Sequence, residues 1–401
     1  MGKMGKFLIF SLRVFLALLF LAVVLGLIAI ARGYRLDFTK KSLSSTGILA
    51  ISSSPKAAKI YINGDLRGVT DLNVALSPGT YSVEIKKDGF TSYNEKITLK
   101  GELVETVDPI LFPVTPSLSP ITNLGVTRAI PVDQSDNLIL FVDNEDAEKD
   151  GIYLFEAGRK TLTFFPPVKT LILKSKLPLD VDFQKTTVYF SYDYKQAIFD
   201  FELADGSLIS YLLSLDAENQ EPFDVTASKD TLIDAWQSER TKETQKLVEV
   251  LPKEIRKIAT SSFEVVSFTP DQTKLLYKAK KDVKLPLVIN PPLIAANQAP
   301  EERVTKKNNL YVYDKREDKN YHVGDEESPS FLWYIDSKRL VFNEGRHITI
   351  MLYDGQSKQV LYSGPIEKGF FTTTSDGKIL ILANLNPQFN KFPDVYQVGI
   401  R

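Results

Sequence analysis

The sequence predicts a mainly β protein with an N-terminal transmembrane helix, a small β-sandwich, and then a β-propeller of about six blades with a short helical insertion. Three observations lead to this prediction. An uninterrupted apolar run lies near the N-terminus. Hydrophobic residues beyond it alternate with polar ones at the spacing of two that is typical of strands, and strand-like segments then recur at intervals of 39 to 65 residues.

The composition is that of a folded protein with two or three domains, because 43% of the 401 residues are hydrophobic and 25% are charged. Seven of the 49 Lys and Arg and one of the 50 acids lie in residues 1–41, which leaves 42 basic and 49 acidic residues beyond. This balance argues against a nucleic-acid partner, which would need a clustered basic surface. The absence of cysteine excludes disulfides, thiolate metal sites and cysteine nucleophiles, and it fits an exported bacterial protein.

From Val14 to Ala31 the chain runs for eighteen residues without a charged side chain. As a helix this run spans about 27 Å, close to the hydrocarbon thickness of a bilayer. Basic residues flank it on both sides, so charge alone does not orient it. A short leading tail before a long apolar run and a large domain is typical of a signal anchor. We therefore expect residues 1–13 in the cytoplasm, residues 14–31 in membrane lipid, and the bulk of the chain outside the cytoplasm, in the cell envelope.

Two other interpretations of the apolar run are open. Ala29-Ile30-Ala31 satisfies the small-x-small rule for signal-peptide cleavage, in which case the mature chain would begin at Arg32. The run is longer than the usual apolar region of a signal peptide, which favours retention. A buried core helix is disfavoured because such helices rarely lack a polar face over eighteen residues.

After a Ser-rich linker, residues 32–46, the period of two begins, and residues 47–112 are expected to form a small β-sandwich. Leu72, Val74 and Leu76 fall on one side of a predicted strand, and Tyr81, Val83 and Ile85 on one side of another. Asn63-Gly64 is the strongest hairpin signal, since both residues tolerate the positive φ of a type I′ turn. Further turns are predicted at Pro78-Gly79 and Asp88-Gly89.

The segments GILAISSSPKAAKIYINGDLRGVT and LSPGTYSVEIKKDGF resemble a PEGA domain over about seventy residues. The tetrapeptide that names the family falls at Pro55-Lys56-Ala57-Ala58, where its Glu and Gly are replaced, whereas the YING, PGTY and KDGF turns keep their places. The resemblance implies a small β-sandwich of surface proteins that makes surface or interdomain contacts. It carries over no catalytic residue.

A Pro-rich linker, residues 113–120, precedes a repeated unit in residues 121–401. A polar turn recurs just before an apolar strand, with Leu138, Val188, Leu232, Leu275, Leu340 and Ile379 as markers. Their intervals suit propeller blades, five to seven in number with six preferred. Because the chain ends in the strand-like DVYQVGIR, we expect an early strand near Ile121 to Thr127 to complete the last blade.

The segments TPDQTKLLYKA and NNLYVYDKR are the best copy of the unit and resemble the TolB-like or WD40-like propeller repeat. Two interruptions break the pattern. KLVEVLPKEIRKIA places Leu247, Leu251, Ile255 and Ile258 at helical spacing, and Pro252 lies where a helix can begin, so a short inserted helix is expected. LPLVINPPLIAANQAPEERVTKKNN is a long Pro- and Asn-rich loop, which either binds a partner or covers its own blade.

Catalytic motifs are missing. HExxH, GxSxG, the phosphate-binding GxxxxGK[ST] loop and GxGxxG do not occur, so zinc protease, serine hydrolase and nucleotide-binding classes have no support and no cofactor is expected. His322 and His347 lack a motif partner and are interpreted as structural. The acidic loop of Asp143, Asn144, Glu145, Asp146 and Asp150 misses the EF-hand spacing, so a solvated hairpin tip is favoured over a Ca²⁺ site.

The sequence therefore favours a non-enzymatic binding or scaffolding protein of the envelope, whose propeller presents its loops to a protein or glycan partner. A hydrolase with carboxylates in the propeller funnel, or a sensor or assembly subunit of a membrane complex, are the alternatives. The candidate contacts are the long loop and two aromatic residues, which are expected more in the core than at a contact. They are Leu285, Leu287, Ile289, Pro291, Pro292, Leu293, Ile294, Trp333 and Tyr334.

Overall fold

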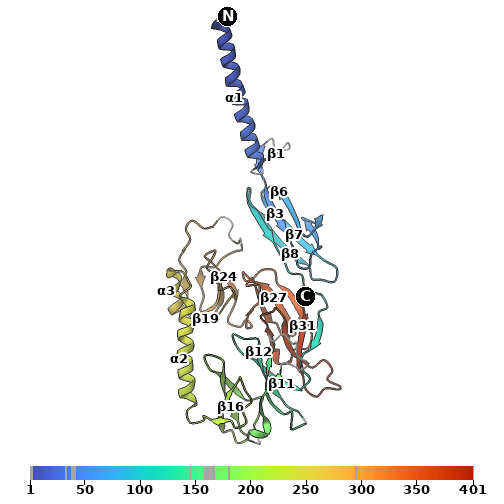
Figure 1. The fold of residues 1–401 in the computed structure, drawn as a ribbon, viewed down its shortest axis with the longest axis vertical. Helices are drawn as coiled ribbons and strands as arrows, with labels where there is room; N and C mark the ends of the chain where they lie inside the picture. Colours follow the sequence, from blue (N-terminus) through green and yellow to red (C-terminus); the bar gives the residue numbers. More distant parts are fainter. Residues whose placement is uncertain are drawn as a thin grey trace. The chain divides into compact units, whose positions relative to one another are not determined.

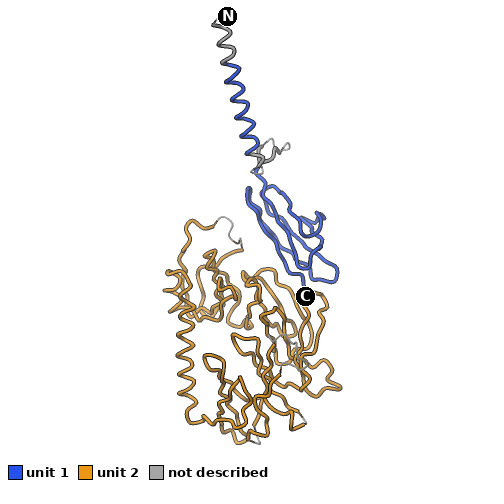
Figure 2. Tube along the Cα trace, in the orientation of Figure 1, with its two compact units in different colours: residues 1–112 blue, residues 113–401 orange. Residues whose placement is uncertain are grey.

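The computed structural model describes residues 3–31, 34–37, 42–144, 146–157, 168–178, 181–293, 297 and 299–400. The chain divides into two compact units, residues 1–112 and residues 113–401 (Figure 2).

The first unit begins with a long apolar helix. Helix α1 (Lys3–Ala31) contains an 18-residue stretch, Ser11–Ile28, that is apolar enough to cross a membrane and has none of its surface buried. The predicted segment 14–31 lies within this helix. Strands β1 (Tyr34–Asp37) and β2 (Ser42–Ser45) then pair antiparallel, so the segment expected to be a plain linker contains paired strands.

Residues 47–112 form two facing sheets, as predicted (Figure 1). One has the order β6-β3-β9 and the other β5-β4-β7-β8. The strands are β3 (Gly47–Ile51), β4 (Lys59–Ile62), β5 (Asp65–Val69), β6 (Leu72–Leu76), β7 (Gly79–Lys86), β8 (Tyr93–Leu99) and β9 (Val104–Val107). Alternate residues such as Leu49, Ile60 and Val83 are buried in one core. Asn63 and Gly64, at φ 52° and 87°, form the two-residue turn between β4 and β5, which confirms the hairpin.

The second unit contains five four-stranded antiparallel sheets within the residues that the structure describes (Figure 1). The first four are β11–β14 (Val126–Pro131, Asn137–Val142, Gly151–Glu156, Val168–Leu173), β15–β18 (Thr187–Phe190, Gln196–Glu202, Leu208–Ser214, Phe223–Asp224), β19, β20, β23 and β24 (Phe263–Phe268, Lys274–Ala279, Leu310–Asp314, Lys319–Gly324), and β25–β28 (Leu332–Trp333, Arg339–Asn343, His347–Leu352, Gln359–Ser363). The fifth joins β29 (Phe371–Thr373), β30 (Ile379–Ala383) and β31 (Asp394–Gly399) to β10 (Ser117–Pro120). We number these sheets as blades 1 to 5.

Neighbouring blades share cores, which explains why their central strands are apolar on both faces. In β12, Ile139 and Phe141 pack with Phe199 of blade 2, whereas Leu138 and Leu140 pack with residues of blade 5. Blades 3 and 4 pack in the same way. A strand that is buried on both faces has hydrophobic residues at consecutive positions, as the sequence NLILFV of β12 does.

The last blade is completed by an early strand, but this strand lies before the predicted place. β10 pairs with β31 from Ser117 opposite Gly399 to Pro120 opposite Tyr396, within the segment predicted to be a linker. Residues Ile121 to Thr127 instead contain the connection to β11 and its first residues. Three prolines, at 113, 116 and 120, favoured a linker in this segment, yet an edge strand such as β10 accepts proline because its outer N–H groups need no partner.

The described residues form five blades, which is within the predicted range of five to seven but one fewer than the preferred six, because one marker residue does not lie in a strand. Leu232 lies in helix α2 (Lys229–Val248), which runs from blade 2 towards blade 3 (Figure 1). A second helix, α3 (Lys253–Ser262), follows after Pro252 at its N-cap. The single short insertion predicted here is therefore two helices. Ile255 and Ala259 of α3 are buried against blade 3, where Leu275 and Tyr277 belong to the same core.

The turn between the first and second strand has the same geometry in all five blades. In each turn an Asp precedes a residue with φ between 55° and 79°: Gln134, Tyr194, Gln272, Ser337 and Gly377. Neighbouring turns touch one another. The Asp271 N–H donates to Ser337 Oγ (3.2 Å), Tyr334 Oη donates to the Gly377 carbonyl (3.1 Å), and the Ser375 N–H donates to Asp136 Oδ1 (2.7 Å). We refer to these five turns as the turn ring.

On the opposite side of the blades, the Asp394 carboxylate ties β31 to the start of blade 1. This side chain is 8% exposed. Its Oδ1 accepts hydrogen bonds from Thr122 Oγ1 (2.8 Å), the Leu124 N–H (2.9 Å) and the Gly125 N–H (3.3 Å), while the Val395 N–H donates to Thr122 Oγ1 (2.9 Å). One carboxylate thus joins segments about 270 residues apart.

We expect Asp394→Ala to destabilise the second unit by roughly 2–4 kcal/mol, because three donors lose a charged acceptor. The two tryptophans, Trp236 and Trp333, lie in this unit, so tryptophan fluorescence during denaturant unfolding of the full chain in detergent reports on it alone. Glu221→Ala, an exposed acid of the same unit, is the control. Equal unfolding midpoints for the two variants would show that the carboxylate does not hold the closure.

Candidate functional site

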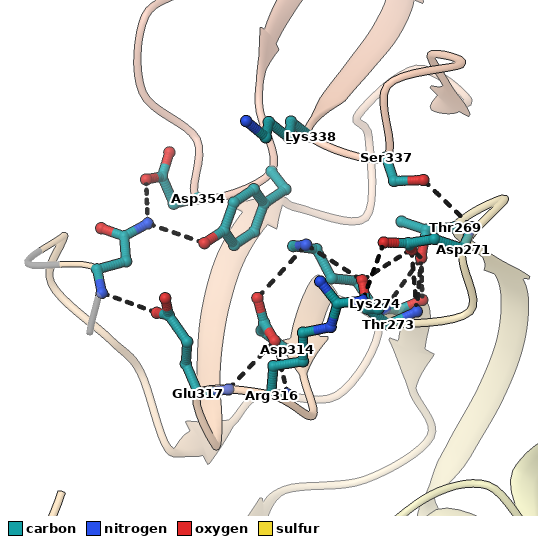
Figure 3. Close-up of polar contacts among 12 residues, drawn as sticks. Thr269, Asp271, Thr273, Lys274, Asp314, Arg316, Glu317, Ser337, Lys338 and Asp354 are labelled. Atoms are coloured by element: carbon teal, nitrogen blue, oxygen red, sulfur yellow. Dashed lines mark hydrogen bonds and ion pairs between the residues drawn. The ribbon is translucent and has the colours of Figure 1, made fainter. Parts of the chain in front are cut away.

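A dense network of hydrogen bonds and ion pairs lies at the turn ring, where blades 3 and 4 meet (Figure 3). Lys274, only 8% exposed, lies with its Nζ 3.5 Å from Asp314 Oδ2 and 4.5 Å from the centre of the Tyr353 ring. Asp314 Oδ1 also accepts the N–H groups of Arg316 (2.8 Å) and Glu317 (3.3 Å). The lysine is therefore held by a carboxylate and a ring, and the carboxylate also fixes the turn between β23 and β24.

Asn297 extends this network to the long loop. Its N–H donates to Glu317 Oε2 (2.8 Å), and its Nδ2 donates to Tyr353 Oη (3.1 Å) and Asp354 Oδ2 (2.7 Å). Burial raises the pKa of the Glu317 carboxyl. A raised pKa is a property of general acids, but this carboxyl is engaged by the loop backbone. The arrangement fastens a loop, and we do not interpret it as a catalytic pair.

The predicted contact loop is fastened at its start as well. The N–H groups of Val288 and Ile289 both donate to Asp318 Oδ2, at 2.7 and 3.0 Å, and Asp318 is 2% exposed beside Arg303. Leu285 is buried in the core of blade 3, whereas Leu287 and Leu293 are 52% and 47% exposed. The loop thus covers its own blade and still presents apolar side chains.

The predicted contact residues therefore separate into groups. Leu287, Pro291, Pro292 and Leu293 are exposed, Ile289 is half-buried, and Ile294 lies outside the described residues. Leu285, Trp333 and Tyr334 are in the core and offer no surface to a partner, because Trp333 packs with Phe331 and Leu340 and Tyr334 reaches the neighbouring turn.

A hollow of about 280 Å³ lies where the connection after β10 meets the β12–β13 and β30–β31 loops. It is called the junction hollow here, and its lining comes from blade 1, blade 5 and the segment between them. The lining residues are Asn123, Leu124, Gly125, Asp143, Asn144, Phe389, Asn390, Lys391, Phe392 and Asp394. Sequence reasoning missed this site. The only local signal is the QFNKF segment, in which two aromatic residues flank Asn and Lys.

The floor of the junction hollow is held by the hydrogen bonds to Asp394 described above, and its wall by Asn144, whose Nδ2 donates to the Leu124 carbonyl (3.0 Å). Gly125, at φ 79°, lets the floor pass close to Phe392, whose side chain would lie 3.4 Å from an added Cβ. By contrast, the side-chain amides of the exposed Asn123 and Asn390 make no hydrogen bond to any described residue. The site therefore combines a fixed backbone with open amide groups.

The acidic loop predicted at residues 143–150 forms part of this wall. Asn144 Oδ1 accepts the Asp146 N–H (2.9 Å), and Asp146 Oδ1 accepts the Glu148 N–H (3.1 Å), which makes a tight polar turn. Lys149 pairs with Asp146, and Lys174 pairs with Asp150 at 3.4 Å. Glu145 lies outside the described residues. Among the residues that the structure describes, no group of three or more His, Asp or Glu side chains is placed to hold a metal ion.

Residues 46–108 match the family model of the PEGA domain, so the chain contains a PEGA domain before its propeller. A comparison with curated protein sequences found no significant match.

Solved structures that share similarity with the chain include a putative TolB from Agrobacterium tumefaciens, at 13% identity and a TM-score of 0.22, covering 67% of this chain and 76% of that one. A GH43_1 enzyme from Xanthomonas citri has 10% identity and a TM-score of 0.30, covering 71% and 90% of the two chains. A mitotic checkpoint complex chain has 10% identity and a TM-score of 0.30, with 72% and 96% covered. The propeller assignment rests on the sheets of the chain itself.

The carboxylate of Asp271 in the turn ring makes the stability of the fold depend on pH. Burial raises the pKa of Asp271, but hydrogen bonds from Thr269 and Thr273 and the charge of Lys274 outweigh this effect and lower the pKa to about 2. Because this value is below the unfolded pKa of about 3.9, the ionised group stabilises the fold above pH 4 and this contribution is lost as the pH falls towards 2.

We expect Asp271→Asn to be less stable than the parent chain near neutral pH, and the difference to shrink between about pH 4 and pH 2. Denaturant unfolding followed by tryptophan fluorescence at a series of pH values measures it. The exposed Asp216→Asn serves as control. A difference that does not change with pH would exclude the carboxylate charge as its cause.

Asp318 gives a second prediction. Asp318 adopts φ 53°, a backbone conformation that Asn also tolerates, so the substitution Asp318→Asn leaves this conformation unchanged. The new side-chain NH₂ group would face backbone N–H donors, and Arg303 would lose its ion pair with the carboxylate. We expect a loss of roughly 2–4 kcal/mol and faster proteolytic cleavage within residues 286–293, detected by limited proteolysis and mass spectrometry. The exposed Glu327→Gln serves as control. If Asp318→Asn is cleaved in residues 286–293 no faster than the control variant, Asp318 does not fasten the loop.

Proposed function

We propose that this chain is a non-enzymatic binding or scaffolding protein of the cell envelope, held in the membrane by α1, with its bulk outside the cytoplasm and its propeller offered to a protein or glycan partner. The observation that carries this proposal is the junction hollow, where open amide groups and an exposed aromatic ring surround a backbone fixed by Asp394. Recognition sites are concave and pre-formed in this way.

Three features support the membrane anchor and its orientation. Helix α1 is long and apolar enough over Ser11–Ile28 to cross a membrane, and from Val14 to Ile28 it has no charged side chain on any face. The resemblance of residues 46–108 to a PEGA domain implies a surface location. The remaining chain is mildly acidic and free of cysteine, as suits an exported domain.

A hydrolase with a site in the funnel is the less favoured alternative. The Asp carboxylates of the turn ring accept hydrogen bonds within their own turns, as Asp271 does from Thr269 Oγ1 (2.7 Å) and Asp193 from Ser191 Oγ (2.7 Å). Hydrogen bonds to the ionised form lower the pKa of Asp193, which is the wrong direction for a general acid at neutral pH. These groups are suited to fixing turns.

Because the chain has no cysteine, single introduced cysteines test both location and binding. In whole cells that express Gln388→Cys or Glu221→Cys, both exposed positions, a membrane-impermeant maleimide is expected to label both variants, whereas Lys3→Cys is labelled only after permeabilisation. Labelling of Lys3→Cys alone in intact cells would reverse the orientation.

The same variants, carrying a photoreactive group on the introduced thiol, test the hollow in native membranes. We expect cross-linked adducts from position 388, which precedes the lining residue Phe389, and none above background from position 221, which lies in blade 2 away from the hollow-lining residues. Equal yields at the two positions would contradict a binding role for the hollow.

A further inference from the structure

We infer that the junction hollow binds an uncharged sugar ring of an envelope glycan, with Phe389 as the stacking surface and Asn123 and Asn390 as the hydrogen-bonding groups. This inference rests on the proposed function and names the ligand class of its site. It follows from four properties of the hollow: an exposed ring, open amides, balanced charge and small size.

The ring of Phe389 is 83% exposed although it lines a hollow. Its loop is tied in place, since the N–H groups of Phe389 and Asn390 donate to the Asn386 carbonyl (3.0 and 2.9 Å), and Asn384 Nδ2 donates to the Asn390 carbonyl (2.9 Å). An aromatic face in water that is held by its backbone provides a flat apolar surface at low entropic cost. The C–H face of a pyranose ring is flat and apolar as well, and so it fits such a surface.

The edge of a sugar ring carries hydroxyl or acetamido groups, which both donate and accept hydrogen bonds. The side-chain amides of Asn123 and Asn390 also do both, and they make no hydrogen bond to the described part of the chain. Asp143, half-buried on the wall, adds acceptor oxygens. A stacking face beside amide and carboxylate groups is the arrangement that an amphipathic ring requires.

The charges of the lining argue against an anionic or cationic ligand. Asp394 is committed to the floor, where it accepts three hydrogen bonds. Asp143 has Lys174 Nζ 3.9 Å from its Oδ1, and the Lys391 ammonium lies 5.1 Å from the centre of the Phe392 ring. A phosphate would need several converging cations, and a cation would need several free carboxylates. A neutral ligand requires neither converging cations nor free carboxylates.

The size of the hollow restricts the ligand further. A volume of about 280 Å³ is just below the roughly 300–1,000 Å³ typical of small-molecule sites. The hollow suits one end or one ring of a longer glycan chain, and an extended apolar protein surface would not use the open amides of Asn123 and Asn390 in its lining. We therefore favour a glycan over a protein partner.

The test measures binding of two tetrasaccharides to the full-length chain in detergent micelles by calorimetric titration. Chitotetraose carries acetamido groups, and cellotetraose has the same linkage without them. Phe389→Ala is expected to weaken binding by about tenfold or more, as for a central aromatic contact, while Phe389→Trp retains it. Phe223→Ala, which removes a ring that is 68% exposed in blade 2, is the matched control and is expected to bind as the parent chain does.

The outcomes separate the hypotheses. Binding of chitotetraose alone supports recognition of the acetamido group, and binding of both sugars supports recognition of the ring hydroxyls. Equal losses in Phe389→Ala and Phe223→Ala overturn the placement at the hollow. If neither sugar binds the parent chain while position 388 still gives protease-sensitive adducts in membranes, the glycan inference is overturned and the proposed binding function stands.

Discussion

The second unit depends on the closure of its last blade by β10, a strand that precedes the rest of the propeller in sequence. Each blade has two apolar faces, so no blade buries its hydrophobic surface alone. Blade 1 illustrates this dependence, because Leu138 and Leu140 of β12 share a core with Leu380 and Val395 of blade 5. Without the pairing of β10 with β31 and the hydrogen bonds to Asp394, these side chains would lose the partner that the chain supplies from about 250 residues away. The closure therefore converts five separate sheets into a unit with shared cores.

The period-two pattern and the turn chemistry predicted most of this architecture, because both are local. An Asp followed by a residue at positive φ sits before the second strand of every blade, and the polar turn residues are visible in the sequence. The preferred count of six blades was one too high because Leu232 lies in a helix, whereas the five described blades fall within the predicted range. The segment SKDTLIDAW has a polar turn and a short apolar run, and periodicity alone does not separate a short buried strand from part of a helix. The charged, glycine-free residues that continue to Val248 favour α2.

The candidate site was harder to predict than the fold, because its residues do not lie in one contiguous stretch of the sequence. Asn123 and Asn144 lie before and after the paired strands β11 and β12, whereas Phe389 comes from a distant segment that the closure brings beside them. The long loop shows the opposite problem. Its apolar run is conspicuous in the sequence, but which of its side chains face outward is decided by Asp318 and Asn297, which hold its backbone. Leu285 is buried and Leu287 is exposed for that reason, and no hydrophobicity pattern contains this information.

Closure and recognition share one structural element. The Leu124 and Gly125 N–H groups that Asp394 binds form the floor of the junction hollow, so the energy that closes the ring also orders the site before any ligand arrives. A ligand that meets an ordered floor and a tied Phe389 loop does not have to offset the entropy of ordering them. The two roles are nevertheless separable by residue. Asp394 is buried and would act on both, whereas Phe389 is exposed, packs in none of the described cores, and has a role in the proposed recognition alone. A propeller closed at this position therefore places a pre-formed site at its own seam, where residues from the first and last blades meet.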